Sequence, residues 1–412
     1  MTITLTNKHE AVTLRDLAGA ARQRRPVHAM CCAASVITVP ANLALQQTDH
    51  WSALATASES APFLRPEWIA AYLQHYEPAA RVIRLDVVRQ QHLIGTLPLI
   101  NELCLWYGVP VRRLRTPVHP LWPDRFDITC AENQAESVAR AFWRHLSNQS
   151  AWDVIELADL PEGGPGWQLM RMAESHGYSI GIRPSQHPPF MSLGADGHRG
   201  NGAPPTSKFR ANLRRRRRNL DQLGPLTFRR QTEFDEAMLS QFLQLEHRGW
   251  KGQNGTSILS DRRTTDYYMA LAREAADSGY LVMYSLDLAG EPIAMHFGLA
   301  LHGRYFVPKL AFDEAYRALA PGHLLVEDVI KDCTLRGFTE FDFLGDEMPW
   351  KMEWTDQLRP HYRVHIFNRT VAGRLAYLAR YRVLPRLNAA HKSLHPGTTQ
   401  PGSVFNPARE TA

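Results

Sequence analysis

The chain has little cysteine, with five in 412 residues. They are Cys31, Cys32, Cys104, Cys130 and Cys333. None has the Cys-x-x-Cys spacing of a structural zinc site, and they are too few and too scattered for a disulfide scaffold. The usage fits a reducing compartment.

Several catalytic signatures are also missing. The sequence has no GxGxxG, no GxxxxGK[ST], no HExxH and no GxSxG. The sequence therefore lacks the usual motifs of four enzyme classes: nicotinamide dehydrogenases, P-loop nucleotide hydrolases, zinc proteases and serine hydrolases.

Long apolar runs are scarce. An uncharged run over residues 26–45 follows three arginines, a pattern similar to a weak signal peptide. It contains Pro40 and Asn42 and is short for a membrane span of about 20 apolar residues. The alternative is a disordered tail over 1–30, followed by a strand over Ala33–Val39.

Hydrophobic residues are present at 44% and charged residues at 21%, so the chain can build real cores. Its length suggests two domains. A Gly/Pro-rich stretch near 194–206 marks the boundary between them. The prediction is a disordered tail (1–30), an N-terminal domain (31–195), a linker (196–206), a C-terminal domain (207–392) and a second disordered tail (393–412).

Both halves show the same order of elements: helix, antiparallel strands, helix, strand. The first half is predicted to hold strands over 81–88, 93–100 and 152–157 and helices over 66–76, 134–146 and 167–176. The second is predicted to hold helices from 207, over 233–248, 264–278 and 323–336, and strands over 280–288, 292–301, 304–312 and 338–343. A last strand (361–367) and helix (372–384) complete it. This indicates a tandem duplication of an α/β (α+β) unit.

The stretch around Arg304–Phe343 offers an anion site. A strand, a turn ending in Gly322, a helix and a second strand follow one another, and a helix N-terminus attracts phosphate. Arg317 adds positive charge. The alternative is an ordinary Pro-Gly turn.

Acid–base residues follow the last of these strands. Asp342 lies within an apolar strand, and Asp346 and Glu347 come just after it, with Lys351 close by. A carboxylate beside a lysine can take a proton from an amine and stabilise an oxyanion. The alternative is a buried Asp342–Lys351 ion pair that holds the strand end.

Three further positions carry two interpretations each. Alternation places His296 beside small residues, so it is predicted to face a cleft, or else to be structural. Tyr305 is a candidate hydrogen-bond donor, or else a packing residue. Trp250 and Lys251 form a loop that closes over a substrate, or else one that ends a helix.

The net charge of +6 is concentrated in one helix. Residues 208–218 hold seven basic residues and no acidic ones, so subtracting them leaves a net charge of −1. Phe209, Leu213 and Leu220 give this helix a narrow apolar stripe. No nucleic-acid-binding motif accompanies it, so an anionic membrane surface or a phosphorylated substrate is favoured over specific nucleic acid.

A series of segments resembles one family. They are Ser207–Leu213 with Arg214–Arg218, Trp250-Lys-Gly, Pro292–Gly298, Ala320–Leu325, and Phe341–Glu347 with Lys351 and Trp354. The series resembles the acetyltransferase domain of the CelD/BcsL-like family in the GNAT superfamily, and is similar to the FemAB-type transferases with two GNAT units. Residues 61–68 and 97–99 resemble the opening of the same family.

The resemblance implies two tandem GNAT-like units, each with a mixed, mainly antiparallel twisted sheet flanked by helices. The donor, acetyl-CoA or a longer acyl-CoA, would enter between the strands 304–312 and 338–343. Its pyrophosphate would lie at Gly322, His323 and Leu324, near Arg317. The sequence departs from the usual [RQ]xxGx[GA] loop, having Arg317-Ala-Leu-Ala-Pro-Gly322.

The chain is therefore predicted to be an N-acyltransferase that uses acyl-CoA, needs no metal, and works in the cytoplasm or at the inner face of the membrane. An amino sugar of an envelope polysaccharide, or an amino lipid, would accept the acyl group by direct attack. The predicted catalytic residues are Asp342, Lys351, His296 and Glu347, and the predicted substrate-binding residues are Trp250, Lys251, Tyr305, Asp346 and Trp354. The alternatives are a transferase that uses aminoacyl-tRNA and a degenerate scaffold without activity.

Overall fold

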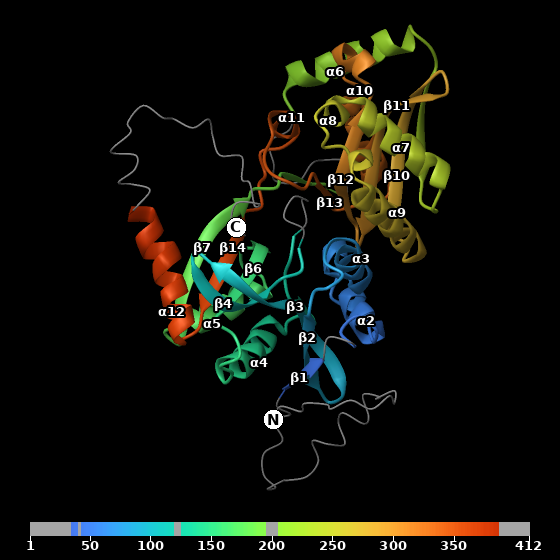
Figure 1. Cartoon of the computed structure of the whole chain (residues 1–412). Helices are drawn as coiled ribbons and strands as arrows, with labels where there is room; N and C mark the ends of the chain where they lie inside the picture. Colours follow the sequence, from blue (N-terminus) through green and yellow to red (C-terminus); the bar gives the residue numbers. More distant parts are fainter. Residues whose placement is uncertain (1–33, 40–42, 119–124, 195–204, 387–412) are drawn as a thin grey trace.

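The computed structural model describes residues 34–39, 43–118, 125–194 and 205–386 (Figure 1). Its strands form two sheets flanked by helices, which confirms the predicted mixed α/β class. The predicted tails (1–30 and 393–412) and nearly all of the predicted linker (196–206) lie outside the described residues. The domain boundaries stay a prediction.

The first sheet has the strand order β1-β2-β3-β4-β6-β14-β7, with β5 paired to β3. Its strands are β1 (Ser35–Val39), β2 (Val82–Arg89), β3 (His92–Trp106), β4 (Val109–Arg115), β5 (Thr129–Cys130), β6 (Val154–Pro161), β7 (Ser179–Gln186) and β14 (His361–Phe367). The predicted hairpin is β2 and β3. Neighbours pair antiparallel except β4 and β6, which are parallel.

The second sheet has the strand order β8-β13-β12-β11-β10-β9. Its strands are β8 (Phe190–Ser192), β9 (Leu226–Gln231), β10 (Leu281–Leu288), β11 (Glu291–Leu301), β12 (Arg304–Phe312) and β13 (Glu340–Asp342). The predicted meander is β10, β11 and β12, and its two tight turns place Ala289 and His302 at positive φ. The single parallel pair is β12 with β13, joined by a crossover helix.

Helices cover both sheets. In the first half they are α2 (Asp49–Ala57), η2 (Pro62–Leu64), α3 (Pro66–Tyr76), α4 (Ala135–Ser147) and α5 (Pro165–Ser175). The second half holds α6 (Ser207–Asp221), α7 (Glu236–Arg248), α8 (Trp250–Gln253), η3 (Ile258–Ser260), α9 (Arg262–Asp277), η4 (Glu314–Leu319), α10 (Pro321–Leu335), α11 (Pro349–Met352), α12 (Val371–Leu378) and the π-helical turn η5 (Ala379–Val383). Thr206 caps α6 by accepting a hydrogen bond from the Phe209 N–H.

The two sheets exchange strands. β8, from the first half of the chain, pairs with β13 in the second sheet. β14, from the end of the chain, lies between β6 and β7 in the first sheet. The last strand was expected to complete the second unit. It completes the first, so each sheet needs a strand from the other half of the sequence.

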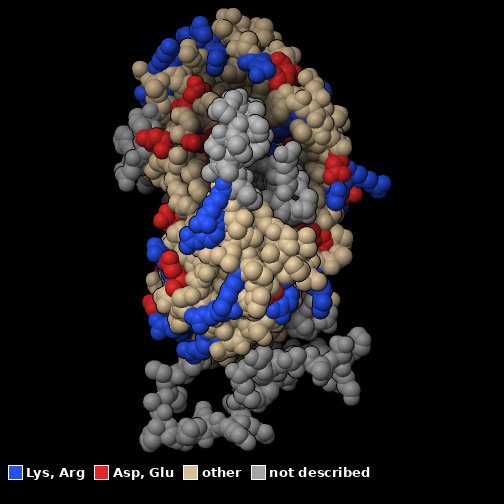
Figure 2. All heavy atoms as spheres, turned by 60° about the vertical axis from the view of Figure 1, so that its left-hand side comes forward, with Lys and Arg blue, Asp and Glu red and all other residues tan. Residues whose placement is uncertain are grey.

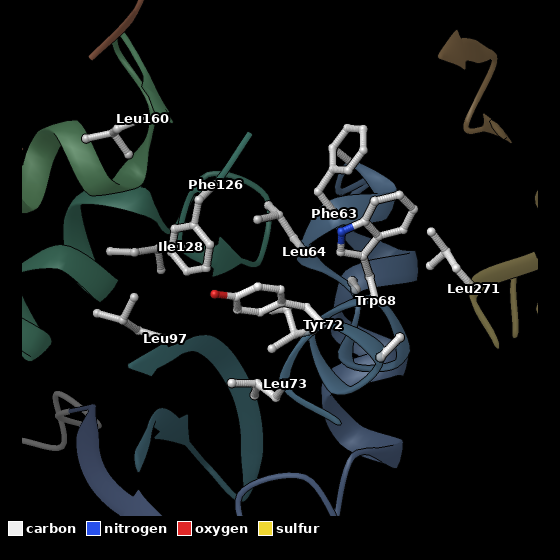
Figure 3. Packing of buried hydrophobic residues seen from close by; sticks show 14 of the residues in the cluster. Phe63, Leu64, Trp68, Tyr72, Leu73, Leu97, Phe126, Ile128, Leu160 and Leu271 are labelled. Atoms are coloured by element: carbon white, nitrogen blue, oxygen red, sulfur yellow. The ribbon is translucent and has the colours of Figure 1, made fainter. Parts of the chain in front are cut away.

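One hydrophobic core runs through both units. Helix α3 packs against α9, and Trp68 and Tyr72 of α3 are in the same buried cluster as Leu271 of α9. Figure 3 shows Tyr72 pointing toward Phe126 and Leu97, while the Trp68 ring lies against Phe63 with Leu271 to its side. Because apolar burial is the main favourable term in folding, this shared core holds the two units together.

Candidate functional site

The parallel strands β12 and β13 part soon after they meet. Their register ends at the Phe306–Asp342 pair, yet β12 continues to Phe312. A bulge in the β11–β12 register lies at the same level, between Phe297 and Leu299. The backbone groups of β12 beyond Phe306 have no partner strand on that side among the described residues. The two strands therefore separate beyond Phe306, within the stretch where the donor was expected to enter.

Helix α10 begins beside this opening. Ala320 adopts a left-handed backbone (φ 49°) and turns the chain into the helix, with Pro321 at its first position. A Cβ built on Gly322 would lie 3.4 Å from Leu310 and 3.5 Å from Phe312, which is ordinary contact. The helix N-terminus thus packs directly on the free end of β12, where its positive dipole end favours an anion.

Asp342 is fully buried at the point where the strands part. Its carboxylate forms ion pairs with Arg125 and, at 2.7 Å, with Arg359, and it accepts a hydrogen bond from the Leu344 N–H at 2.9 Å. Burial alone would raise the pKa of Asp342, but the two arginine charges outweigh it and hold the pKa below its usual value. The predicted ion pair between Asp342 and Lys351 is wrong, because Asp342 pairs with the two arginines instead.

Lys351 is buried on α11, seven residues beyond the end of the buried Phe341–Leu344 segment. Its ammonium donates hydrogen bonds to the carbonyl oxygens of Leu344 and, at 2.8 Å, Asp346. Burial lowers the pKa of Lys351 to about 8, although the charges of Asp342 and Asp346 oppose the shift. The result is a desolvated cation beside the strand end.

Two predicted carboxylates lie on the surface next to it. Asp346 and Glu347 are exposed, and Asp346 accepts a hydrogen bond from the His187 N–H at 2.9 Å. The turn that carries them has positive φ at Leu344 (50°) and Gly345 (57°). This turn brings Asp346 and Lys351 together, as the sequence predicts.

His296 and Tyr305 lie in the core instead of in a cleft. Both are fully buried, with 3.4 Å between the Tyr305 hydroxyl and His296 Nδ1. Burial lowers the pKa of His296 to about 3, so the ring is neutral at physiological pH. The expectation that His296 faces a cleft is wrong, because Tyr305 reaches over Gly298 and fills the space beside it.

Some of the predicted donor-binding residues are partly exposed at the start of α10, and the others are buried or lie away from it. His323 accepts a hydrogen bond from the Trp354 indole at 3.2 Å, and burial together with the charge of Arg216 lowers its pKa to about 4. Leu324 is buried in the core, as is Trp354, which was predicted to bind the substrate. Arg317 is exposed on η4 and pairs with Glu314 at 3.3 Å. Only Gly322 and His323 thus lie partly exposed at the helix start.

Trp250 and Lys251 border a shallow hollow at the end of β12. Its other lining residues are Leu245, Glu246, Gly249, Leu310, Ala311, Phe312 and Glu314. The Lys251 ammonium pairs with the buried Glu246 carboxylate at 2.8 Å, while Trp250 stays half exposed. The loop therefore lies against the predicted donor strand.

The basic helix α6 lies beside α10 (Figure 1). Arg217 faces α10 and pairs with Asp328 at 2.8 Å and Glu327 at 3.5 Å. Lys208, Arg210, Arg214, Arg215 and Arg218 are exposed. Lys and Arg side chains gather at the same upper end of the molecule in Figure 2. The helix offers a positive outer face and one anchoring arginine.

Sequence reasoning missed three residues of this site. Arg125, Arg359 and His361 surround Asp342, and both ring nitrogens of His361 are buried without a hydrogen-bond partner among the described residues. Burial, then the charge of Arg125, lowers the pKa of His361 to about 3. Only the cost of an unpaired buried Asp342 pointed to such partners, without naming them.

No group of three or more His, Cys, Asp or Glu residues that could hold a metal ion occurs in the described part of the chain. No described helix is long and apolar enough to cross a membrane.

Comparison with known families gives a match within the second unit. Residues 207–352 match the family model described as acetyltransferase (GNAT) domain. The matched range runs from α6 to α11 and contains the parted strands, α10 and Lys351. The match supports an N-acyltransferase enzyme. The narrower resemblance to CelD/BcsL-like proteins stays a prediction.

The solved structure of FemX shares this fold. FemX is similar with a TM-score of 0.53 at 11% identity, covering 81% of this chain and 98% of that chain. A C-terminal domain of a putative lysylphosphatidylglycerol synthetase from Agrobacterium fabrum matches at 0.47 and 11%, covering 84% and 95%. A tandem GNAT protein from the clavulanic acid biosynthesis pathway matches at 0.42 and 15%, covering 81% and 98%. No curated protein matches this chain in sequence.

Proposed function

We propose that the second unit transfers an acyl group from acyl-CoA to an amine, with the donor bound where β12 and β13 part. One observation carries the proposal: β12 runs six residues beyond its last pair with β13, and the start of α10 packs beside that free stretch. Unpaired strand groups can hold the amide-bearing arm of the donor, as in β-strand addition. The helix N-terminus can hold its pyrophosphate.

Basic side chains near α10 support an anionic donor. Arg216 lies close enough to His323 for its charge to lower the pKa of that imidazole. The exposed arginines of α6 extend this positive region outward. Arg317, by contrast, is paired with Glu314 and contributes less.

Lys351 is the proposed electrostatic catalyst. Its ammonium is held beside the strand end by two carbonyl oxygens, so it can stabilise the oxyanion that forms when the amine attacks the thioester. Asp342 is the proposed positioning residue, because two arginines fix it and its lowered pKa makes it a weak base. Among the predicted catalytic residues, exposed Glu347 is the proposed proton acceptor.

The acceptor is proposed to approach from the hollow at Trp250 and Lys251. These residues lie against Leu310–Phe312, so an amine held there reaches the donor strand. The family resemblance supports an amino sugar of an envelope polysaccharide or an amino lipid, handled in the cytoplasm or at the inner face of the membrane. An aminoacyl-tRNA is the second candidate donor, favoured by the exposed arginines of α6.

Calorimetry on the full chain tests the donor. Acetyl-CoA and palmitoyl-CoA are titrated into wild type, Gly322→Asp and the neutral control Gly322→Asn. A carboxylate in the first turn suits the helix dipole but repels a pyrophosphate. Gly322→Asp is expected to bind CoA esters about tenfold more weakly than Gly322→Asn.

Three results would count against the proposal. If Gly322→Asp and Gly322→Asn bind the CoA esters equally well, the donor does not bind at the start of α10. No binding of either CoA ester, with amine transfer from charged tRNA, would establish the second donor. No binding and no transfer, with Lys351→Met still functional in cells, would favour the scaffold.

A further inference from the structure

The C-terminal helix presents an apolar face to solvent. Val371, Leu375 and Leu378 of α12, and Val383 of η5, are each between 47% and 76% exposed. The first three are spaced four and three apart, which places them on one side of an α-helix. The π-helical turn Ala379–Val383 turns less per residue than an α-helix, so it keeps Val383 near the same side.

The orientation of this helix is fixed by its other side. α12 packs on β4, β14 and β7, and Ala376, Tyr377 and Tyr381 join a buried cluster with Trp106 and Phe367. Gly373 lies so close to the Asn368 and Asp153 carbonyl oxygens that a Cβ there would approach them to 2.4 and 2.8 Å. The helix therefore cannot roll to bury its outer face.

Positive charge accompanies the exposed apolar side chains. The segment 368–386 holds five arginines, at 369, 374, 380, 382 and 386, and no acidic residue. All but Arg380 are exposed. Figure 2 brings this side of the molecule forward and shows a broad area without charged side chains, with Lys and Arg gathered along its lower edge and a few Asp and Glu at its sides. Exposed apolar residues flanked by arginine suit the interface of an anionic bilayer.

We propose that the face formed by Val371, Leu375, Leu378 and Val383 with Arg374, Arg382 and Arg386 (the α12 face) docks the protein on an anionic membrane surface. The apolar side chains enter the headgroup region while the arginines contact lipid phosphates. This surface is separate from α6 and the donor site, so the inference does not depend on the proposed transferase activity.

Vesicle co-sedimentation of the full chain tests the α12 face. Wild type is expected to bind vesicles with about one third phosphatidylglycerol about tenfold more tightly than pure phosphatidylcholine, because arginines near an anionic surface gain attraction. Leu375→Gln with Leu378→Gln is expected to reduce binding to the anionic vesicles about tenfold, since two exposed leucines no longer enter the bilayer. Arg374→Gln with Arg382→Gln should abolish the preference for phosphatidylglycerol.

The matched control is Arg214→Gln with Arg215→Gln on α6, which removes two exposed arginines elsewhere and should leave binding unchanged. All replaced residues are exposed, so the variants should keep the thermal unfolding midpoint of wild type. Loss of binding only in the α6 variant would overturn the proposal. So would wild-type dimers in solution that the leucine variant converts to monomers without any vesicle binding, because a second copy would then cover the face.

Discussion

At the residue scale, the buried Asp342 carboxylate predicts an effect on stability. It is buried between Arg125 and Arg359, so its removal leaves two cations without their shared counter-charge. Asp342→Asn is expected to lower the free energy of unfolding by about 3–5 kcal/mol. Urea unfolding at neutral pH measures it. In Glu340→Gln, Arg359 keeps Asp342, so a much smaller loss is expected; an equal loss would contradict this assignment.

The shifted pKa of Lys351 predicts a pH profile. If its ammonium stabilises the oxyanion, kcat/KM should fall above pH about 8, where the buried amine loses its proton. Lys351→Met should lower kcat/KM by about 10²–10³. Lys351→Arg restores the charge with a higher pKa and should remove the alkaline decline. Persistence of that decline in Lys351→Arg would assign it to another group.

Two buried histidines predict acid sensitivity. The pKa of His296 and of His361 is about 3 in the folded chain, against 6.5 in the unfolded one. Below pH 6.5 the unfolded chain binds protons that the folded chain does not, so stability falls as the pH drops toward 3. Each of the two histidines should lower the free energy of unfolding by about 2 kcal/mol as the pH falls from 6.5 to 5. In urea unfolding at pH 7 and 5, His296→Leu should show a smaller difference than wild type.

At the element scale, the close packing of α12 at Gly373 predicts that alanine destabilises the protein there, although helix propensity alone favours alanine. Alanine is better than glycine in a helix by about 1 kcal/mol, but a Cβ at Gly373 meets two backbone carbonyl oxygens that cannot move easily. Gly373→Ala is therefore expected to lower the thermal midpoint, with a cost of about 1–3 kcal/mol. Gly249→Ala, whose nearest atom is 3.5 Å away, is the control and should be near neutral.

Elements with strong local signals were predictable from the sequence. Helix α3 was predicted over its observed range, and β10, β11 and β12 lie within a residue of prediction because tight turns separate them. β4 and β7 were missed: β4 carries Arg112, Arg113 and Arg115, whose charges are balanced by Asp153, Glu102 and Glu156 from elsewhere in the sheet. Such compensation depends on tertiary partners that alternation cannot show.

The site was predictable to the extent that its chemistry is local. One turn brings Asp346 to Lys351, whose ammonium donates to the Asp346 carbonyl oxygen, and Glu347 is the next residue of that turn. Arg125 and Arg359 reach Asp342 from other segments of the chain, so no spacing in the sequence predicts these ion pairs. Tyr305 and Trp354 were candidates for substrate contact, but the same apolar character buries them.

At the scale of the whole molecule, the exchanged strands predict that the halves do not fold alone. A chain ending near residue 195 lacks β14, which lies between β6 and β7, and a chain starting at 205 lacks β8. Each half alone should give a weak near-ultraviolet circular dichroism signal and aggregate on gel filtration. Co-expression of both should restore a native complex. A half that folds cooperatively by itself would contradict the prediction.

The position of β14 also affects folding during synthesis. About 180 residues separate the end of β7 from the end of β14. At ribosomal rates of roughly 5–20 residues per second, the first sheet waits about 10–40 s for its missing strand. Through that interval the edges of β6 and β7 lack their β14 partner. These strand edges are therefore exposed to pairing with other chains until β14 has left the ribosome.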